Sequence, residues 1–285
     1  MKKNDTLFSV IIPTLNEEKF LPNLLSDFKN QQLKNFKVII VDANSRDKTK
    51  ERALKFSAFI PLDFYSVKKK NVAYQRNYGA KKADEEYFIF LDADARIGTS
   101  FTENIYKGII QKKYKRGLLF LPVLTTNSSS TRIKVLFNLI NSVIYMSQST
   151  NRPFAPGGSI FISRHLFFDI NGFRENLYMS EDHDLVQRAK EFGVRAKILK
   201  NVKVAFNLRR VEKEGETVVL YKYFLALVYM LVNEKITNKA FLYEMGGDGY
   251  KDLQSKNKKG RLKNETERLR ALFKKTSSFL SESLL

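Results

Sequence analysis

The chain has 285 residues, of which 43% are hydrophobic, and this is enough to form a large core. It contains no cysteine and only two histidines, so disulfides and thiolate metal sites are excluded, and a zinc site with several histidines is not expected. The net charge of +20 at pH 7 indicates an anionic partner: nucleic acid, an anionic membrane or a phosphorylated substrate.

Apolar runs alternate with helical patterns along the first 95 residues. Short runs rich in branched and aromatic residues predict strands at 7–12, 36–41, 62–67 and 87–91. Apolar residues at helical spacing predict helices at 20–28, 49–56 and 72–83. Because this alternation is typical of parallel β–α–β units, we expect an α/β fold.

The rest of the chain is less regular. Further strands are predicted at 118–123, 159–163 and 196–206, and further helices at 133–146, 165–170 and 181–192. The apolar stretch 218–232 is interrupted by Lys222 and is short for a membrane span, so we expect a core or interfacial helix there. Residues 251–264 carry six basic side chains and one acidic side chain, which indicates an exposed linker before a short amphipathic helix at 265–279.

Polar side chains follow three of the predicted strands, at the edge where open α/β sheets bind ligands. The most informative are Asp92 and Asp94, which end the run 87–91. Two carboxylates this close repel each other unless a positive group lies between them. A hard divalent cation that bridges carboxylates to substrate phosphates is the simplest such group. A polar turn after a strand is the alternative for this pair taken alone.

The sequence resembles glycosyltransferase family 2, whose members have the GT-A fold of nucleotide-diphospho-sugar transferases. The resemblance is carried by segments in the family's order, at 10–18, 38–47, 76–80, 90–94, 156–158 and 180–185. It covers roughly residues 6 to 210. It implies a GT-A, Rossmann-like fold, with a mixed, mainly parallel sheet flanked by helices.

We expect a GT-A domain over 1–235, with a nucleotide-binding half at about 1–95 and an acceptor half at about 96–235. A basic, partly helical C-terminal extension would follow at 236–285.

The resemblance also implies roles for residues at the first two strand ends. The base and ribose of the nucleotide would lie between two walls, formed by Pro13, Thr14, Asn16 and Glu17 on one side and by Asp42 on the other. A carboxylate can accept hydrogen bonds from a ribose diol. The alternative for Glu17 is a charge at a helix N-terminus, and the alternative for Asp42 is a turn residue.

The diphosphate and its metal ion would be bound by three further residues. Arg76 would approach the diphosphate, for which its forked donors are suited, although it could instead be a surface arginine. Asp92 and Asp94 would hold Mn²⁺ or Mg²⁺, and Asp94 would bind it more directly. The metal would neutralise charge on the leaving nucleoside diphosphate.

In the acceptor half, Asp182 matches the family's catalytic base, which takes the proton of the acceptor hydroxyl during an inverting displacement. A helix cap is the alternative for Asp182. Gly158 would let the backbone approach the sugar or acceptor closely, or it belongs to an ordinary turn. Arg210 lies in a basic stretch that would close on the diphosphate, or it is part of a solvated charge pair. His183 would touch phosphate or metal, or it is a structural histidine.

The sequence thus predicts an inverting, metal-dependent glycosyltransferase that moves one sugar from a UDP- or GDP-sugar to an acceptor hydroxyl or lipid phosphate in cell-envelope glycan or glycolipid synthesis. Processive synthesis is disfavoured because the Gln-x-x-Arg-Trp signature is missing. With no signal-peptide pattern, a cytoplasmic location is expected, with the cytoplasmic face of an anionic membrane as a possible attachment surface. The alternatives are a nucleotidyltransferase and a nucleic-acid-binding protein. Nucleic acid is disfavoured because the carboxylates at the strand ends would repel phosphate.

Overall fold

The computed structural model describes residues 6–110, 117–177 and 180–207. The chain divides into two compact units, and all the described residues belong to the first of them. The predicted segments at 218–232, 251–264 and 265–279, together with Arg210, lie outside the described residues.

Eight strands of the described chain form one sheet, in the order β3-β2-β1-β4-β7-β6-β8-β5. Their bounds are β1 Phe8–Thr14, β2 Phe36–Asp42, β3 Leu62–Ser66, β4 Tyr87–Leu91, β5 Arg96–Ile97, β6 Leu119–Thr126, β7 Ser159–Ser163 and β8 Lys197–Phe206. Strands β1 to β4 run parallel to one another, as do β6 and β8, whereas β7 is antiparallel to both of its neighbours and β5 is antiparallel to β8.

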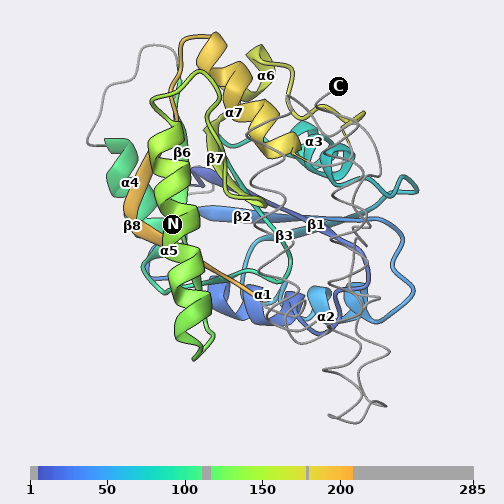
Figure 1. The fold of residues 1–285 in the computed structure, drawn as a ribbon. Helices are drawn as coiled ribbons and strands as arrows, with labels where there is room; N and C mark the ends of the chain where they lie inside the picture. The colour runs from blue at the N-terminus through green and yellow to red at the C-terminus, as the bar shows by residue number, and fades with distance from the viewer. Residues whose placement is uncertain (1–5, 111–116, 178–179, 208–285) are drawn as a thin grey trace, which may run out of the picture. The chain divides into compact units, whose positions relative to one another are not determined.

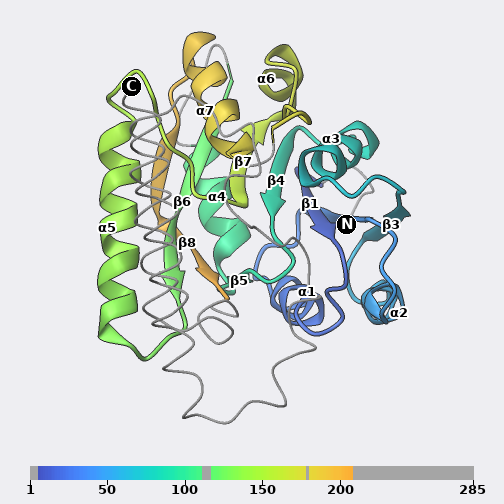
Figure 2. The same cartoon turned by 45° about the vertical axis from the view of Figure 1, so that its right-hand side comes forward.

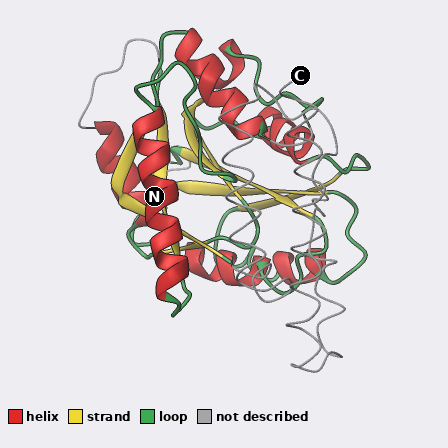
Figure 3. Ribbon diagram, viewed as in Figure 1, coloured by secondary structure: helices red, strands yellow, loops and turns green. Residues whose placement is uncertain are grey.

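Helices cover both faces of the sheet (Figures 1 and 3). Their bounds are α1 Leu21–Lys29, α2 Thr49–Leu54, α3 Val72–Lys82, α4 Phe101–Ile110, α5 Thr131–Ser147, α6 Arg164–Asp169 and α7 Glu181–Glu191. Helices α1 and α2 lie on one face of β1 to β3, and α3, α6 and α7 lie on the opposite side (Figure 1). Helix α5 packs along β6 (Figure 2). None of the helices in the described ranges is long and apolar enough to cross a bilayer.

Strand β1 is buried on both faces, as expected for a central parallel strand between two helix layers. Its residues Val10 and Ile12 belong to the core cluster that includes the apolar residues of α1. On the opposite face, Ile11 meets Gly79 of α3 so closely that a Cβ at residue 79 would lie 2.5 Å from the Ile11 side chain. Glycine at this position therefore lets α3 approach the sheet and directs Gln75 and Arg76 inward.

The reversed direction of β7 positions the site. Leu91, at the end of β4, pairs with Ser159, at the start of β7. The two residues just outside this pair, Asp92 and Gly158, are therefore also neighbours, and the Asp92 amide donates to the Gly158 carbonyl at 3.1 Å. A loop from the second half of the sequence is brought in this way to the carboxyl end of a strand from the first half.

The expected fold class is confirmed: the described residues form a mixed α/β structure around a mostly parallel sheet. Every predicted strand and helix within them is present, with bounds that differ by at most a few residues. Two elements had not been predicted, the two-residue strand β5 and helix α4.

Candidate functional site

The ends of β1 and β2 form one side of the site. Thr14 and Asp42 are register partners, and the Thr14 hydroxyl donates to Oδ1 of Asp42 at 2.8 Å. The Asp42 side chain also accepts from the backbone amide of Ser45 at 2.8 Å. Asp42 is buried, as is Pro13 beside Thr14. The carboxylate of Asp42 is thus held in one orientation at the strand end.

The loop after β1 is joined to the loop after β2 by hydrogen bonds. Asn16 has a positive φ of 56°, which asparagine tolerates better than most residues. Its backbone amide donates to the Ser45 hydroxyl, and its side-chain oxygen accepts from the Arg46 amide, each at 2.8 Å. Glu17 is buried, and its amide donates to the hydroxyl of Thr49 at 2.8 Å. Both predicted residues therefore lie at the junction of the two loops.

Gln75, which sequence reasoning had missed, ties these strand ends to α3. Its buried amide nitrogen donates to the carbonyls of Thr14 and Val41, at 3.0 and 2.7 Å. These two hydrogen bonds fix the neighbouring strands β1 and β2 at their carboxyl ends. Its position beside Arg76, in a helix segment covered by the family resemblance, was the only signal in the sequence.

Arg76 is the centre of a buried charge cluster. Its side chain is only 2% exposed, and its guanidinium contacts three carboxylates. One terminal nitrogen, Nη2, lies 2.9 Å from Asp92, and the other, Nη1, lies 2.9 Å from Glu181 and 3.1 Å from Asp182. Burial lowers the pKa of Arg76, but the three carboxylates outweigh it and raise that pKa above its ordinary value. The arginine is therefore always charged and cross-links the ends of β4 and α7.

Gly158 contacts two of the same residues, Asp182 and Asp92. Its amide donates to Oδ2 of Asp182 at 2.9 Å, while its carbonyl accepts from the Asp92 amide. Its φ is +77°, and a Cβ at this residue would lie 2.1 Å from Oδ2 of Asp92. Only glycine fits here, because the Asp92 carboxylate occupies the space that a side chain would need.

Asp182 lies at the start of α7 with both carboxylate oxygens held, one by Arg76 and one by Gly158. It is not the cap of the helix, since Ser180 occupies that position with a positive φ of 66°. Burial raises the pKa of Asp182 to about 7, helped by Glu181 and Asp92 and opposed by Arg76 and the Gly158 amide. A carboxyl group with this pKa can both accept and release a proton near neutral pH.

Residues of α3 and residues just before it form hydrogen bonds and an ion pair with the loop that precedes α7. Asn77 accepts from the backbone amide of Phe173 at 2.9 Å and donates to the carbonyl of the same residue at 2.8 Å. Asn71 donates to the Glu175 carbonyl at 3.0 Å, and Lys69 forms an ion pair with the Glu175 side chain at 2.5 Å. Arg76 of α3 therefore contacts Asp182 directly, while Asn77 and the residues just before α3 hold the segment 173–175 that precedes α7.

The two residues that follow Asp182 in α7 have structural partners. His183 accepts a hydrogen bond at Nδ1 from the Ala155 amide at 2.9 Å, and burial lowers its pKa to about 4, so the ring is neutral. Asp184 binds Arg174 and Arg188 at 3.0 and 2.7 Å. The contacts with Ala155 and Arg174 tie α7 to two loops that precede it in the chain.

Asp94 lies two residues beyond Asp92 and is partly buried. The described residues contain no cluster of three or more acidic or histidine side chains arranged to hold a metal ion by themselves. Two carboxylates on one short turn can supply only part of an octahedral shell, so any ion here would need further oxygens from a substrate. Phosphate oxygens are suited to that role.

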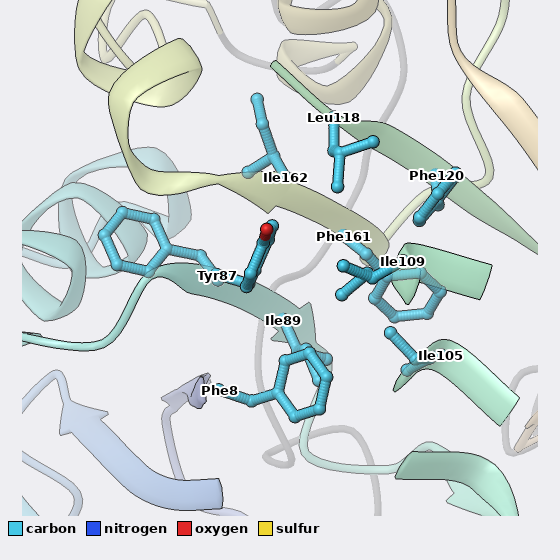
Figure 4. A pocket seen from close by; sticks show the side chains of 10 residues that line it. Phe8, Tyr87, Ile89, Ile105, Ile109, Leu118, Phe120, Phe161 and Ile162 are labelled. Atoms are coloured by element: carbon cyan, nitrogen blue, oxygen red, sulfur yellow. The ribbon is translucent and has the colours of Figure 1, made fainter. Parts of the chain in front are cut away.

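A small apolar cavity lies elsewhere, between β4, β7 and α4 (Figure 4). Its walls are aliphatic and aromatic side chains, among them Phe8, Tyr87, Ile105 and Phe161. Because it lacks convergent polar groups, we interpret it as a packing space in the core and not as a ligand site.

Comparison with known proteins identifies the family of the chain. The sequence model described as Glycosyl transferase family 2 matches residues 9–168. The chain is 27% identical over 229 residues to the minor teichoic acid biosynthesis protein GgaB of Bacillus subtilis (strain 168), which covers 74% of this chain and 23% of that protein. It is 35% identical over 102 residues to a dolichyl N-acetyl-alpha-D-glucosaminyl phosphate 3-beta-D-2,3-diacetamido-2,3-dideoxy-beta-D-glucuronosyltransferase of Methanococcus voltae, which covers 34% of this chain and 32% of that one. The chain thus spans less than a third of either relative.

Solved structures share the fold. S. aureus TarS in complex with UDP-GlcNAc aligns with a TM-score of 0.56 and 21% identity, over 68% of this chain and 56% of that one. The mannosyltransferase PcManGT of Pyrobaculum calidifontis, in complex with GDP-Man and Mn²⁺, aligns with a TM-score of 0.58 and 15% identity, over 86% and 67% of the two chains. At these identities the likeness concerns the fold alone.

Proposed function

The chain belongs to glycosyl transferase family 2, and from that premise we propose that it transfers one sugar from a UDP- or GDP-sugar to an acceptor hydroxyl or lipid phosphate. We propose that the product is a cell-envelope glycan or glycolipid. In support, TarS was solved with UDP-GlcNAc and PcManGT with GDP-Man, and the relative GgaB is named for teichoic acid synthesis.

One observation carries the proposal. Asp92 and Asp182, which are 90 residues apart in the sequence, both contact Arg76 and Gly158 at the carboxyl edge of the parallel strands. A carboxylate suited to the donor's phosphate side and a carboxylate suited to the acceptor side are thereby held next to each other. A transfer reaction between two substrates requires such an arrangement.

In the proposed reaction, the acceptor oxygen attacks the anomeric carbon from the face opposite the nucleotide. The bond from that carbon to the diphosphate oxygen breaks, and its electron pair leaves with the nucleoside diphosphate. Asp182 takes the proton of the acceptor oxygen, and its pKa of about 7 suits this role. The displacement inverts the configuration at the anomeric carbon.

The donor would lie along the edge formed by β1 and β2. The walls are Pro13, Thr14, Asn16 and Glu17 on one side and Asp42 on the other, where the buried Asp42 carboxylate can accept from a ribose diol. Arg76 would act on the diphosphate side mainly by holding Asp92 in place, because its terminal nitrogens already bind carboxylates. Arg210 remains part of the proposal as a diphosphate contact, from outside the described residues.

The site fits a hard divalent cation. Three carboxylates surround the single guanidinium of Arg76, so the cluster carries an excess of negative charge that Mn²⁺ or Mg²⁺ could offset. Asp94 and Asp92 would hold the ion, with Asp94 the more direct ligand. When bound, the ion would neutralise charge on the leaving nucleoside diphosphate.

We further propose that the nucleotide-binding half extends over about 1–95, the acceptor half over about 96–235, and the basic extension over 236–285. The protein would work in the cytoplasm, at the cytoplasmic face of a membrane. Such a location would suit acceptors that are attached to lipid.

The test begins with thermal shifts for UDP-, GDP-, dTDP- and CMP-sugars, each with and without Mn²⁺ or Mg²⁺, because a ligand that binds the folded state raises Tm. We expect a shift for one uridine or guanosine sugar that requires the metal and is lost in Asp94→Asn. Asp169→Asn, an exposed acid at the end of α6, is the matched control and should keep the shift.

Asp182→Asn should keep the metal-dependent shift and lower transfer by about 10²- to 10⁴-fold, since it retains the shape and the acceptor oxygen but not the base. NMR of the product should show inversion at the anomeric carbon. Normal turnover by Asp182→Asn, or a retained configuration, would refute the assigned base.

A further inference from the structure

The outward face of α5 exposes four large apolar side chains among its polar ones, where a surface helix is expected to be polar. Ile133, Phe137 and Ile144 are buried on the inner face, against β6. Exposed apolar side chains occur on the outer part of the helix, which we call the outer stripe of α5: Val135 (52% exposed), Leu139 (59%), Tyr145 (61%) and Met146 (70%). Within it, Val135, Leu139 and Met146 recur at intervals of four and seven residues and so share one side of the helix. The helix lies at the margin of the described fold in Figure 2.

Along the sequence around α5, the charge has one sign. Residues 104–168 contain nine lysines and arginines and no aspartate or glutamate. Arg132 and Lys134 lie on α5 itself and are exposed, and exposed Arg152 follows the helix. Large apolar side chains on a helix whose charged residues are all cations are typical of helices that lie in the interface of an anionic bilayer.

A second copy of the chain fits this face less well, because it would bring like charges together. An anionic lipid surface satisfies both features at once: acyl chains receive the apolar side chains, and phosphate groups receive the cations. We infer that the outer stripe of α5 is the surface through which this protein lies on an anionic membrane.

The far end of α5 is connected to the candidate site. The Ser147 hydroxyl accepts from the Phe154 amide at 2.9 Å, and the amide of the next residue, Ala155, donates to His183 of α7. From there the loop continues to Gly158, which binds Asp182. A membrane under α5 would therefore lie on the acceptor side of the site, where a lipid-attached acceptor could reach the base. That a lipid-attached acceptor reaches the base rests on the proposed function, whereas the inference that the outer stripe of α5 binds a membrane does not.

The chain contains no tryptophan, so a single introduced tryptophan reports on one position. Met146→Trp places the probe on the outer stripe, and Phe59→Trp, at a 54% exposed position after α2, is the matched control. With the full-length protein and vesicles of phosphatidylcholine with or without phosphatidylglycerol, we expect a blue shift and quenching by brominated acyl chains only for Met146→Trp. Both effects should require phosphatidylglycerol.

Three results would overturn the inference. Unchanged Met146→Trp emission with anionic vesicles would show that the stripe stays in water. Emission that is already blue-shifted without vesicles would show that protein covers this face. The cover would be part of the same chain if the shift does not depend on protein concentration, and a second copy of the chain if it does. Equal quenching of both probes would show that no particular face is used.

A binding measurement complements the probes. Leu139→Gln with Met146→Gln should weaken vesicle binding by roughly tenfold or more, because two large apolar groups no longer leave water. Leu54→Gln with Phe59→Gln removes two other exposed apolar groups, 41% and 54% exposed, and should leave binding within about twofold. Equal losses for the two pairs would contradict the inference. Both pairs should keep the nucleotide-sugar thermal shift, so a failure of membrane binding is distinguishable from a failure of the proposed function.

Discussion

The Asp92 carboxylate lies directly against Gly158, so that a methyl group at residue 158 would come within 2.1 Å of Oδ2 of Asp92. The two residues also share a backbone hydrogen bond of 3.1 Å. The position of the Asp92 side chain is therefore set by the absence of a side chain on a residue 66 positions later.

Gly158→Ala should displace Asp92 and weaken metal-dependent donor binding. Alanine at φ +77° also costs about 1 to 3 kcal/mol of stability in backbone strain, so Tm should fall. Gly157→Ala is the control, because its Cβ would meet nothing closer than Asp182 Oδ2 at 4.0 Å. Donor titration by calorimetry in Mn²⁺ distinguishes them, and equal affinities in both variants would contradict this account.

Arg76→Met should be among the most destabilising single changes in the protein. It leaves three carboxylates together without their cation, and breaking a buried ion pair in this way typically costs about 3 to 5 kcal/mol. Arg96→Met is the control, because Arg96 binds Asp27 with two nitrogens but its side chain is 45% exposed, and its loss should cost less than about 1 kcal/mol. Urea unfolding of both variants measures the difference, and similar losses would show that the Arg76 cluster adds little.

The pH dependence should show opposite trends in activity and stability. Transfer needs the charged form of Asp182, so kcat/KM should rise as pH increases through about 7. The pKa of Asp182 in the folded protein is raised above its ordinary 3.8, so the folded protein binds this proton more tightly than the unfolded chain does. The stability that comes from this proton is therefore lost as pH rises from about 4 to above 7.

Comparison with Asp182→Asn isolates this effect on stability. The lowered pKa of His183 acts in the opposite direction, since its contribution is lost as pH falls from about 6.5 towards 4, but it is present in both proteins. The Tm difference between the wild type and Asp182→Asn should therefore change between pH 4 and 8 in favour of the variant. A constant difference would mean that Asp182 titrates normally.

Asn77→Ala should reduce the rate of transfer more than it reduces donor affinity. It removes both hydrogen bonds to the Phe173 backbone, leaves those groups unpaired at a cost of about 1 to 3 kcal/mol, and loosens the loop that leads to Asp182. Asn141→Ala is a close control, since Asn141 makes the same pair of bonds to the backbone of Leu124, at 2.8 and 2.9 Å. Both variants should lose similar stability, but only Asn77→Ala should lose kcat. Equal kcat values in the two variants would show that the hydrogen bonds between Asn77 and Phe173 are purely structural.

Much of the fold could be predicted because the local pattern and the packing agree. The apolar run that forms β4 is bounded on one side by acidic residues and on the other by Asp92, and the structure gives the predicted bounds unchanged. Helix α4 was not predicted, although Phe101, Ile105 and Ile109 have helical spacing. The place of β7 between β4 and β6 could not be read from the sequence, because strand pairing depends on contacts between distant residues.

Residue types and the family resemblance together pointed to the site, but not to its internal contacts. Arg76 was expected at a diphosphate because arginine suits phosphate; the structure shows it buried among carboxylates, since the close approach of α3 at Gly79 turns it inward. The second cross-link, through Gly158, depends on the β4–β7 register, which no local signal encodes. The predictions for the individual site residues still await the experiments above.

The antiparallel course of β7 also has an evolutionary consequence. The connection between α5 and β7 should tolerate added or lost residues at 149–153, provided that Ser159 still pairs with Leu91 and that Phe154 still binds Ser147. A slip of one residue would bring either Ser159 or Gly157 against Asp92 and would turn every β7 side chain to the other face of the sheet. Length variation in relatives that keep the activity should therefore accumulate before Phe154 and stop there. The number of residues from 154 to 158 should stay constant, because these residues connect the two halves of the fold.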